Sequence, residues 1–242
     1  NKDYNRFSTV GNWSSILTLG VLPEDQLEFF GDSEYASAYN TTIQTLADHG
    51  AQFKVIDFSP FVSAAAQLYE GPWVTERYLA LAELLNEKPD AFWPVTRQII
   101  EEGRSKTAAD AFLSIYSLAD LRVKCLEVLR ECDALLTPTA GKHFSIEEVA
   151  AEPISVNSQL GHYTNYMNLL DLCGVAVPGA STPSGRHFGV TLVADAFKDT
   201  RLLSIAHTLE GFLREPSRRS TETIPDRGIE HQDLSEVAIA VC

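Results

Sequence analysis

Apolar and polar positions in the first sixty residues follow first a strand-like and then a helix-like spacing. Residues 16–21 form a continuous β-compatible apolar run. Asp32 and Ser33 can cap a helix, and Gly50 fits the end of that helix. Its apolar stripe comprises Tyr35, Tyr39, Ile43, Leu46 and Ala47. The next strand is predicted over residues 53–58, so we predict a strand–helix–strand unit.

The rest of the chain continues this alternation without internal repeats or low-complexity tracts. Strands are predicted over residues 134–137, 175–177 and 188–194. Helices are predicted over residues 63–87 with a break at Gly71 and Pro72, 95–102, 107–131, 164–173 and 199–213. The fold class is therefore α/β, with a mixed β-sheet covered by helices.

Composition and charge exclude several classes of function. The chain has 242 residues, of which 45% are hydrophobic and 21% charged, as in ordinary globular domains. A net charge of −14 argues against binding nucleic acid through its phosphates. No apolar run approaches membrane-spanning length and no signal-peptide pattern is present, so we expect a cytoplasmic protein without membrane contact. An anionic substrate would need a local positive site on so acidic a chain.

Cysteine and histidine spacing gives no indication of a metal or redox site. The four cysteines are Cys125, Cys132, Cys173 and Cys242, and no pair has the spacing of a zinc knuckle or a redox motif. The six histidines are scattered, and no two lie four residues apart on one helix. No glycine-rich phosphate loop opens a helix either. We therefore expect free thiols, no metal and no cofactor.

The most informative segment is residues 68–78, with the sequence LYEGPWVTERY. Proline is favourable at a helix start, so a helix is predicted to begin at Gly71 and Pro72. Tyr69 precedes this turn, and Arg77 lies about two turns into the helix. A phenol and a guanidinium can then point into one pocket for a small anion, because arginine matches a carboxylate with two donors. The spacing equally allows an Arg77–Glu surface pair, with Tyr69 and Trp73 as packing residues.

This segment resembles the substrate-binding segment of allophanate hydrolases, which belong to the amidase signature family. Further similar segments follow in the same order. They are residues 25–32 (DQLEFFGD), 133–140 (DALLTPTA), 157–165 (NSQLGHYTN), 168–172 (NLLDL) and 188–192 (FGVTL). The resemblance implies the amidase signature fold, with residues 1–214 forming its C-terminal half. It also implies that Tyr69 and Arg77 contact the carboxylate of the substrate.

Other polar residues in the matching segments have two interpretations. One interpretation is a polar network around a helix start, and the other is capping and loop fixing, for Asn157, Asn165, Asn168 and Asp171. Thr137 and Thr139 flank a proline at a strand end, where they either line a pocket or shape the turn. The segment 141–144 (GKHF) departs from the proline-rich turn that is common in the family, which puts any pocket role of this loop in doubt.

The catalytic residues of the family are missing from this sequence. Amidase signature enzymes use two serines and a lysine. The serines lie in a glycine- and serine-rich stretch, and in the family this catalytic stretch is upstream of the region matched here. The adjacent Ser14 and Ser15 lack such surroundings and are interpreted as a turn. Residues 215–234 are expected to be a linker, and 235–242 the truncated start of a small second domain. We therefore expect an internal piece of a longer protein that is inactive alone, although a natural product of this length is the alternative.

The resemblance implies hydrolysis of allophanate (urea-1-carboxylate) to ammonia and carbon dioxide during urea degradation. The expected partners are the small anionic amide substrate and the N-terminal half of the amidase domain, with homodimerisation left open. Two other functions remain at this point, namely a catalytically dead amidase-like binding module and an amidase for another small amide. A purely structural half-domain, with an exposed apolar sheet face, is a further interpretation.

Overall fold

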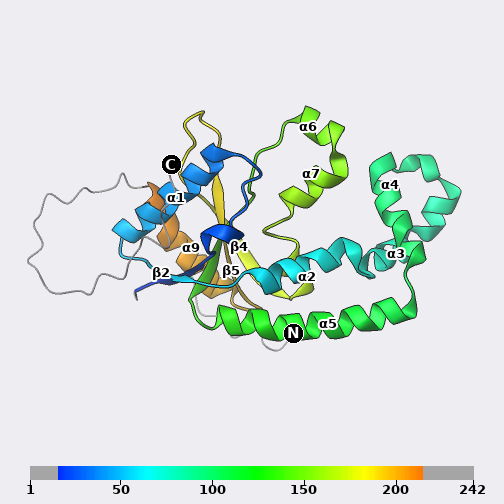
Figure 1. Cartoon of the computed structure of the whole chain (residues 1–242), viewed down its shortest axis with the longest axis horizontal. Helices are drawn as coiled ribbons and strands as arrows, with labels where there is room; N and C mark the ends of the chain where they lie inside the picture. The colour runs from blue at the N-terminus through cyan, green and yellow to red at the C-terminus, as the bar shows by residue number, and fades with distance from the viewer. Residues whose placement is uncertain (1–15, 215–242) are drawn as a thin grey trace, which may run out of the picture.

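The core of the protein is a five-stranded mixed β-sheet, as the sequence predicts (Figure 1). The computed structural model describes residues 16–214. The strand order is β2-β1-β3-β5-β4; β1 pairs in parallel with β2 and β3, whereas β5 runs antiparallel to β3 and β4. The strands are β1 (Thr18–Val21), β2 (Gln52–Val55), β3 (Ala134–Pro138), β4 (Leu172–Pro178) and β5 (Gly189–Asp195).

Helices cover both faces of this sheet and extend beyond it. The longer helices are α1 (Ser33–Asp48), α2 (Ser59–Glu70), α3 (Trp73–Glu87), α5 (Ala108–Leu129) and α9 (Asp199–Arg214). The shorter ones are α4 (Pro94–Glu101), α6 (Ile146–Ala151), α7 (Pro153–Leu160) and α8 (Tyr166–Leu169). Residues 16–214 also contain the 3₁₀ helices η2 (Glu24–Gln26), η3 (Pro89–Ala91) and η4 (Glu102–Ser105).

The alternation of side chains along the strands produces two separate apolar layers. Leu136 and Leu192 belong to the layer under α1 and α9, whereas their neighbours Leu135 and Val193 belong to the layer under α2 and α5. All four side chains are fully buried. Because consecutive strand residues point to opposite faces, both faces of these central strands need helical cover.

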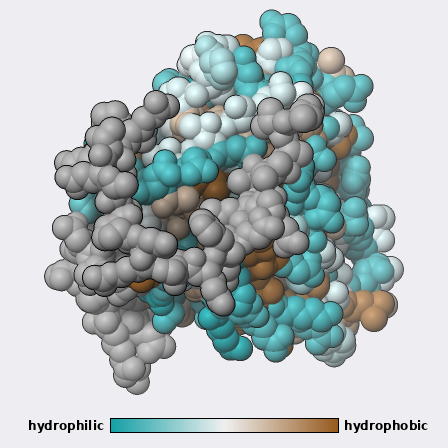
Figure 2. All heavy atoms as spheres, turned by 60° about the vertical axis from the view of Figure 1, so that its left-hand side comes forward, coloured by the Kyte–Doolittle hydropathy of each residue, from teal (hydrophilic) through white to brown (hydrophobic). Residues whose placement is uncertain are grey.

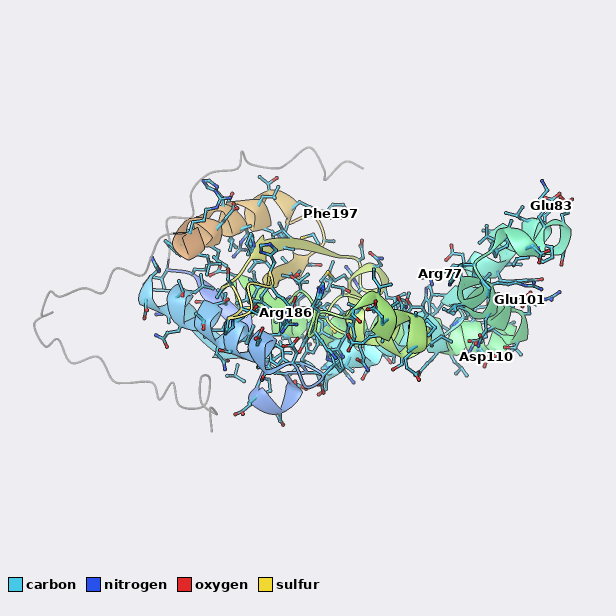
Figure 3. The ribbon with its side chains drawn as sticks, turned by 90° about the horizontal axis from the view of Figure 1, so that it is seen from above. Arg77, Glu83, Glu101, Asp110, Arg186 and Phe197 are labelled. Carbon is cyan, nitrogen blue, oxygen red and sulfur yellow. The ribbon has the colours of Figure 1, made fainter. Side chains whose placement is uncertain are left out.

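The helices α3 and α4, with η3 and η4, form a small lobe beyond the ends of α2 and α5 (Figures 1 and 3). Within the lobe, α3 packs chiefly against η4 and α4. Gly103 makes this packing close, because a Cβ atom there would lie 2.7 Å from the carbonyl oxygen of Val74. The Thr75 hydroxyl also donates to the Gly103 carbonyl oxygen at 2.9 Å. The lobe therefore has its own internal contacts and carries Arg77 away from the sheet.

Several predicted boundaries need correction. Residues 164–173 are not one helix, because only Tyr166–Leu169 are helical and β4 already begins at Leu172. Asp171, with φ of 52°, reverses the chain between them. The strand predicted over 53–58 ends at Val55, and α2 begins at Ser59 instead of residue 63. The helices α6 and α7 were not predicted at all.

The described surface on the side shown in Figure 2 is largely hydrophilic, with separate apolar groups between the polar ones. None of the helices within residues 16–214 combines the length and apolar character needed to cross a membrane. Three parts of the sequence prediction lie outside the described residues, namely Ser14 and Ser15, the linker 215–234 and the strand at 235–242.

Candidate functional site

The turn that joins α2 to α3 carries the two residues predicted to bind a carboxylate. It requires glycine at position 71, since a Cβ atom there would lie 2.4 Å from the Gln67 carbonyl oxygen and 2.9 Å from the Trp73 ring. The Lys106 ammonium donates to the carbonyl oxygen of Glu70 at 2.5 Å and so satisfies the last turn of α2. Pro72 directly precedes the first helical residue of α3.

The structure brings Tyr69 and Arg77 together. The guanidinium carbon of Arg77 lies 5.9 Å from the centroid of the Tyr69 ring, within the range of a cation–π contact. Arg77 lies little more than one turn after the start of α3, closer than predicted, and its side chain is exposed on the lobe (Figure 3). Within residues 16–214 no acidic side chain forms an ion pair with Arg77. The alternative interpretation as a surface ion pair therefore finds no support there.

A third residue, Asn157, joins these two, and its contact with Tyr69 was not predicted. Its side-chain amide on α7 donates to the Tyr69 hydroxyl at 3.1 Å. Tyr69 and Asn157 line a cavity of about 120 Å³, and its remaining walls are Ile99, Glu102, Ile154 and Ser158. The cavity thus lies between the end of α2, the lobe and α7. It offers a phenol and an amide, with a carboxylate from Glu102 that can accept from N–H groups.

The polar residues of the segment 157–171 make separate contacts. Asn165 packs against Gly161, where a Cβ atom would lie 2.3 Å from the Asn165 side chain. Asp171 lies 3.8 Å from Arg122, a weak ion pair. Because no hydrogen bond joins Asn157, Asn165, Asn168 and Asp171 through their side chains in the described structure, the interpretation as a single network is wrong.

Of the two threonines at the end of β3, Thr139 lies at a second hollow, remote in the sequence from Tyr69. Thr139 lines a cavity of about 520 Å³ and shares a 2.9 Å hydrogen bond with the Thr191 hydroxyl. Thr137 is fully buried and does not line that cavity. The loop 141–144 is the segment that departs from the family pattern. In this loop, Gly141 lies so close to Glu28 that a Cβ atom on Gly141 would be 2.3 Å from the Glu28 carbonyl oxygen, whereas His143 is exposed.

A charged cluster fixes the rim of this second hollow. Arg186 in the β4–β5 loop donates to both carboxylate oxygens of Asp32, at 2.7 and 3.0 Å, and to Glu34 at 3.0 Å. The Arg186 guanidinium holds the pKa of the Asp32 carboxyl below its usual range. The Tyr35 hydroxyl donates to the carbonyl oxygen of His187, which lines the hollow with Tyr35. Figure 3 places Arg186 at the sheet and Arg77 in the lobe, so the two arginines belong to different sites.

Neither region contains an evident metal site or activated thiol. Within the described ranges, no three His, Cys, Asp or Glu side chains gather as metal ligands would. Cys125 is buried, and burial raises the pKa of its thiol to about 12. Near Tyr69, the Asn157 amide and the Tyr69 hydroxyl offer hydrogen bonds, and the Arg77 guanidinium offers positive charge.

Comparison with known proteins identifies the family of this chain. The family model described as Amidase matches residues 2–203. Urea amidolyase of Lachancea kluyveri is 36% identical over 184 residues, covering 75% of this chain and 10% of that protein. Urea amidolyase of Saccharomyces cerevisiae is 32% identical over 212 residues, covering 86% of this chain and 11% of that protein. The chain thus spans about a tenth of the length of these relatives.

Solved structures agree with the sequence comparison. Allophanate hydrolase of Kluyveromyces lactis superposes with a TM-score of 0.78 at 33% identity, covering 84% of this chain and 33% of that one. Urea amidolyase of the same organism gives a TM-score of 0.79 at 33% identity, with 84% of this chain and 12% of that one covered. A bacterial amidotransferase subunit from Thermotoga maritima, at 20% identity and a TM-score of 0.58, shares the fold. The predicted α/β amidase fold is confirmed, and the chain belongs to the amidase family.

Proposed function

We propose that this chain is the substrate-carboxylate half of an allophanate hydrolase within a longer protein, called here the parent enzyme. The observation that carries the proposal is the contact of the Arg77 guanidinium with the Tyr69 ring at 5.9 Å. Tyr69 lines a cavity there, and Arg77 forms no ion pair with an acidic side chain among residues 16–214. Relatives named urea amidolyase and allophanate hydrolase support the same assignment. Residues 1–214 then form the C-terminal part of the amidase domain, followed by the linker 215–234 and a second domain from 235.

In this proposal the substrate is held by its carboxylate. Arg77 supplies charge and two donors, and the Tyr69 hydroxyl supplies a third donor. A serine of the missing half, activated through the second serine and lysine, attacks the amide carbonyl, and ammonia leaves. Water then releases the acyl group. An uncharged analogue would leave the guanidinium without its partner, so this pair also selects the substrate.

The N-terminal half of the amidase domain would contact an apolar surface of this chain. The long helix α5 exposes a series of apolar side chains, with exposed fractions of 53% to 68%: Phe112, Leu113, Ile115, Tyr116 and Val123. Such a concentration supports association with further polypeptide, because monomers rarely leave large apolar patches uncovered. The N-terminal half of the amidase domain is the partner we propose for this chain, in a cytoplasmic enzyme, and homodimerisation of the parent is the other association to test.

Kinetics of the parent enzyme test the carboxylate role. Arg77→Ala is expected to lower kcat/KM for allophanate by roughly 10- to 150-fold, as the loss of a hydrogen bond to a charged group predicts. The matched control is Arg104→Ala, since Arg104 contacts the Tyr78 ring at 5.4 Å in the same lobe. The control should change kcat/KM by less than about 3-fold. Equal effects of both variants would remove Arg77 from the site.

Further measurements separate the alternatives. Sequencing the locus on both sides of Asn1 and Cys242 should find an in-frame glycine- and serine-rich stretch with an upstream lysine. A start and a stop codon at these positions, with malonate binding but no turnover, would instead favour a binding module. A parent enzyme that hydrolyses neutral amides as fast as allophanate would favour an amidase of other specificity. The purified chain alone should release no ammonia from allophanate.

A further inference from the structure

The hydrogen bond between Asn157 and Tyr69 has a definite direction. The Asn157 amide nitrogen can only donate, so at 3.1 Å the Tyr69 hydroxyl oxygen is the acceptor. The two residues are 88 positions apart and lie on α2 and α7. Both line the same cavity of about 120 Å³. The contact therefore belongs to the wall of the candidate site.

The direction matters because a phenol has one proton to give. With its oxygen lone pair occupied by Asn157, the Tyr69 hydroxyl keeps its own hydrogen for another acceptor. No group within residues 16–214 accepts that hydrogen. A hydroxyl that accepts one hydrogen bond also donates a stronger one, because linked hydrogen bonds polarise each other. The proton of Tyr69 is thus directed to whatever acceptor occupies the cavity.

We propose that Asn157 is a positioning residue of the substrate site, which holds the Tyr69 hydroxyl as a donor to the substrate carboxylate. This inference rests on the proposed function, because it needs Tyr69 to contact the substrate. The competing interpretation is that Asn157 fastens α7 to α2 by packing contacts that do not involve the Tyr69 hydroxyl. The two differ in one respect: a positioning role disappears when Tyr69 has no hydroxyl.

A double-mutant cycle in the parent enzyme distinguishes these interpretations. Asn157→Leu removes the donor and keeps a similar volume. It should lower kcat/KM for allophanate by roughly 5- to 10-fold and raise the inhibition constant of malonate by the same factor. In a Tyr69→Phe background the same substitution should change either value by less than about 2-fold. Asn157 is exposed, so its variants should fold.

A second variant tests the direction of the bond. Asn157→Asp offers an acceptor in place of a donor, so the Tyr69 proton should turn toward the introduced carboxylate and away from the substrate. Its loss of kcat/KM should exceed that of Asn157→Leu. The matched control is Gln159→Glu, which adds the same charge on α7, where Gln159 contacts Ser155 at 3.5 Å instead of Tyr69.

The outcomes are separable. If Tyr69→Phe itself leaves kcat/KM and the malonate inhibition constant unchanged, the carboxylate role of Tyr69 fails and the inference fails with it. If Tyr69→Phe weakens both but Asn157→Leu has the same effect in the two backgrounds, Asn157 acts through helix packing and only the inference is overturned. Equal losses for Asn157→Asp and Gln159→Glu would also overturn it.

Discussion

Arg186 donates two parallel hydrogen bonds to Asp32, which also accepts from the backbone N–H of Tyr35 and thereby caps α1. One carboxylate thus joins the β4–β5 loop to the first turn of a helix more than 150 residues earlier. The Asp32 side chain is only 6% exposed, whereas that of Arg186 is 33% exposed. Removal of the loop contact would therefore leave a poorly solvated carboxylate beside the helix terminus.

Asp32→Asn should weaken this junction without removing the cap, because asparagine caps helices about as well as aspartate. The expected loss is about 1.5–3 kcal/mol at neutral pH, the range for a hydrogen bond to a charged group. Asp32→Ala should cost about 1 kcal/mol more through loss of the cap. Hydrogen exchange of peptides covering residues 33–40 and 180–188 measures both effects as local opening. Unchanged protection in Asp32→Asn would show that the pair contributes nothing.

The same junction should depend on pH. The pKa of Asp32 in the folded protein lies below its usual value of 3.8, so the carboxylate stabilises the fold at pH values above 3.8. This contribution is lost as the pH falls through the lower folded value. The difference in protection between the wild type and Asp32→Asn should therefore be largest near neutrality and shrink in acid. A difference independent of pH would contradict the ion-pair origin.

Gly71→Ala should displace the turn that sets Tyr69 against Arg77. The added methyl group would meet the Gln67 carbonyl oxygen at 2.4 Å, and backbone cannot move aside as a flexible side chain can. We expect a destabilisation of roughly 1–3 kcal/mol and a lower kcat/KM for allophanate in the parent enzyme. Gly211→Ala is the control, because nothing lies within 4 Å of its added Cβ atom in α9. It should be neutral or stabilise by up to about 1 kcal/mol.

Cys125 should resist alkylation while the protein is folded. Its side chain is completely buried, and a thiol whose pKa is raised to about 12 holds almost no reactive thiolate at neutral pH. Iodoacetamide treatment followed by mass spectrometry should find Cys125 unmodified before denaturation and fully modified after it. Rapid modification in the native protein would mean that α5 separates readily from the sheet.

His162 should make the neighbouring segment sensitive to mild acid. Its ring is half-buried against Phe30 and Tyr163, and burial lowers the pKa of the imidazole, although the nearby Glu28 carboxylate opposes this. As the pH falls below 6.5, the unfolded chain gains a proton before the folded one does, so stability falls. After correction for intrinsic rates, hydrogen exchange at residues 25–32 should become faster in acid. His162→Phe should abolish this dependence.

Local chemistry explains which elements were predictable. The long helix predicted over 107–131 is found as Ala108–Leu129, with Thr107 and Asp110 bonding reciprocally at its start. The helices α6 and α7 were missed because their apolar residues form no buried stripe; Ile146 is 84% exposed and Ile154 is 47% exposed. A usable signal was present, since Ser145 and Glu148 form a capping box at the start of α6.

The candidate site was predictable only in part for a different reason. Helical spacing and a glycine–proline turn bring Tyr69 near Arg77 within a single segment. Asn157 reaches the same place from α7, and helical periodicity reveals which residues share a face but not which distant helix that face meets. The Tyr69–Asn157 contact is a result of tertiary packing, as is the Arg186–Asp32 junction.

The way in which the lobe is connected to the rest of the chain affects substrate binding. The chain enters it at Gly71 and Pro72 and leaves it at Lys106 and Thr107, so Tyr69 and Arg77 stand on opposite sides of the entry. A carboxylate that engages both side chains contacts α2 and the lobe at once, so its binding orders the two side chains and the turn between them. Part of its binding free energy is then consumed as lost motional freedom. Substitutions that make these two connections more rigid would raise the affinity for the substrate without altering any group that contacts it.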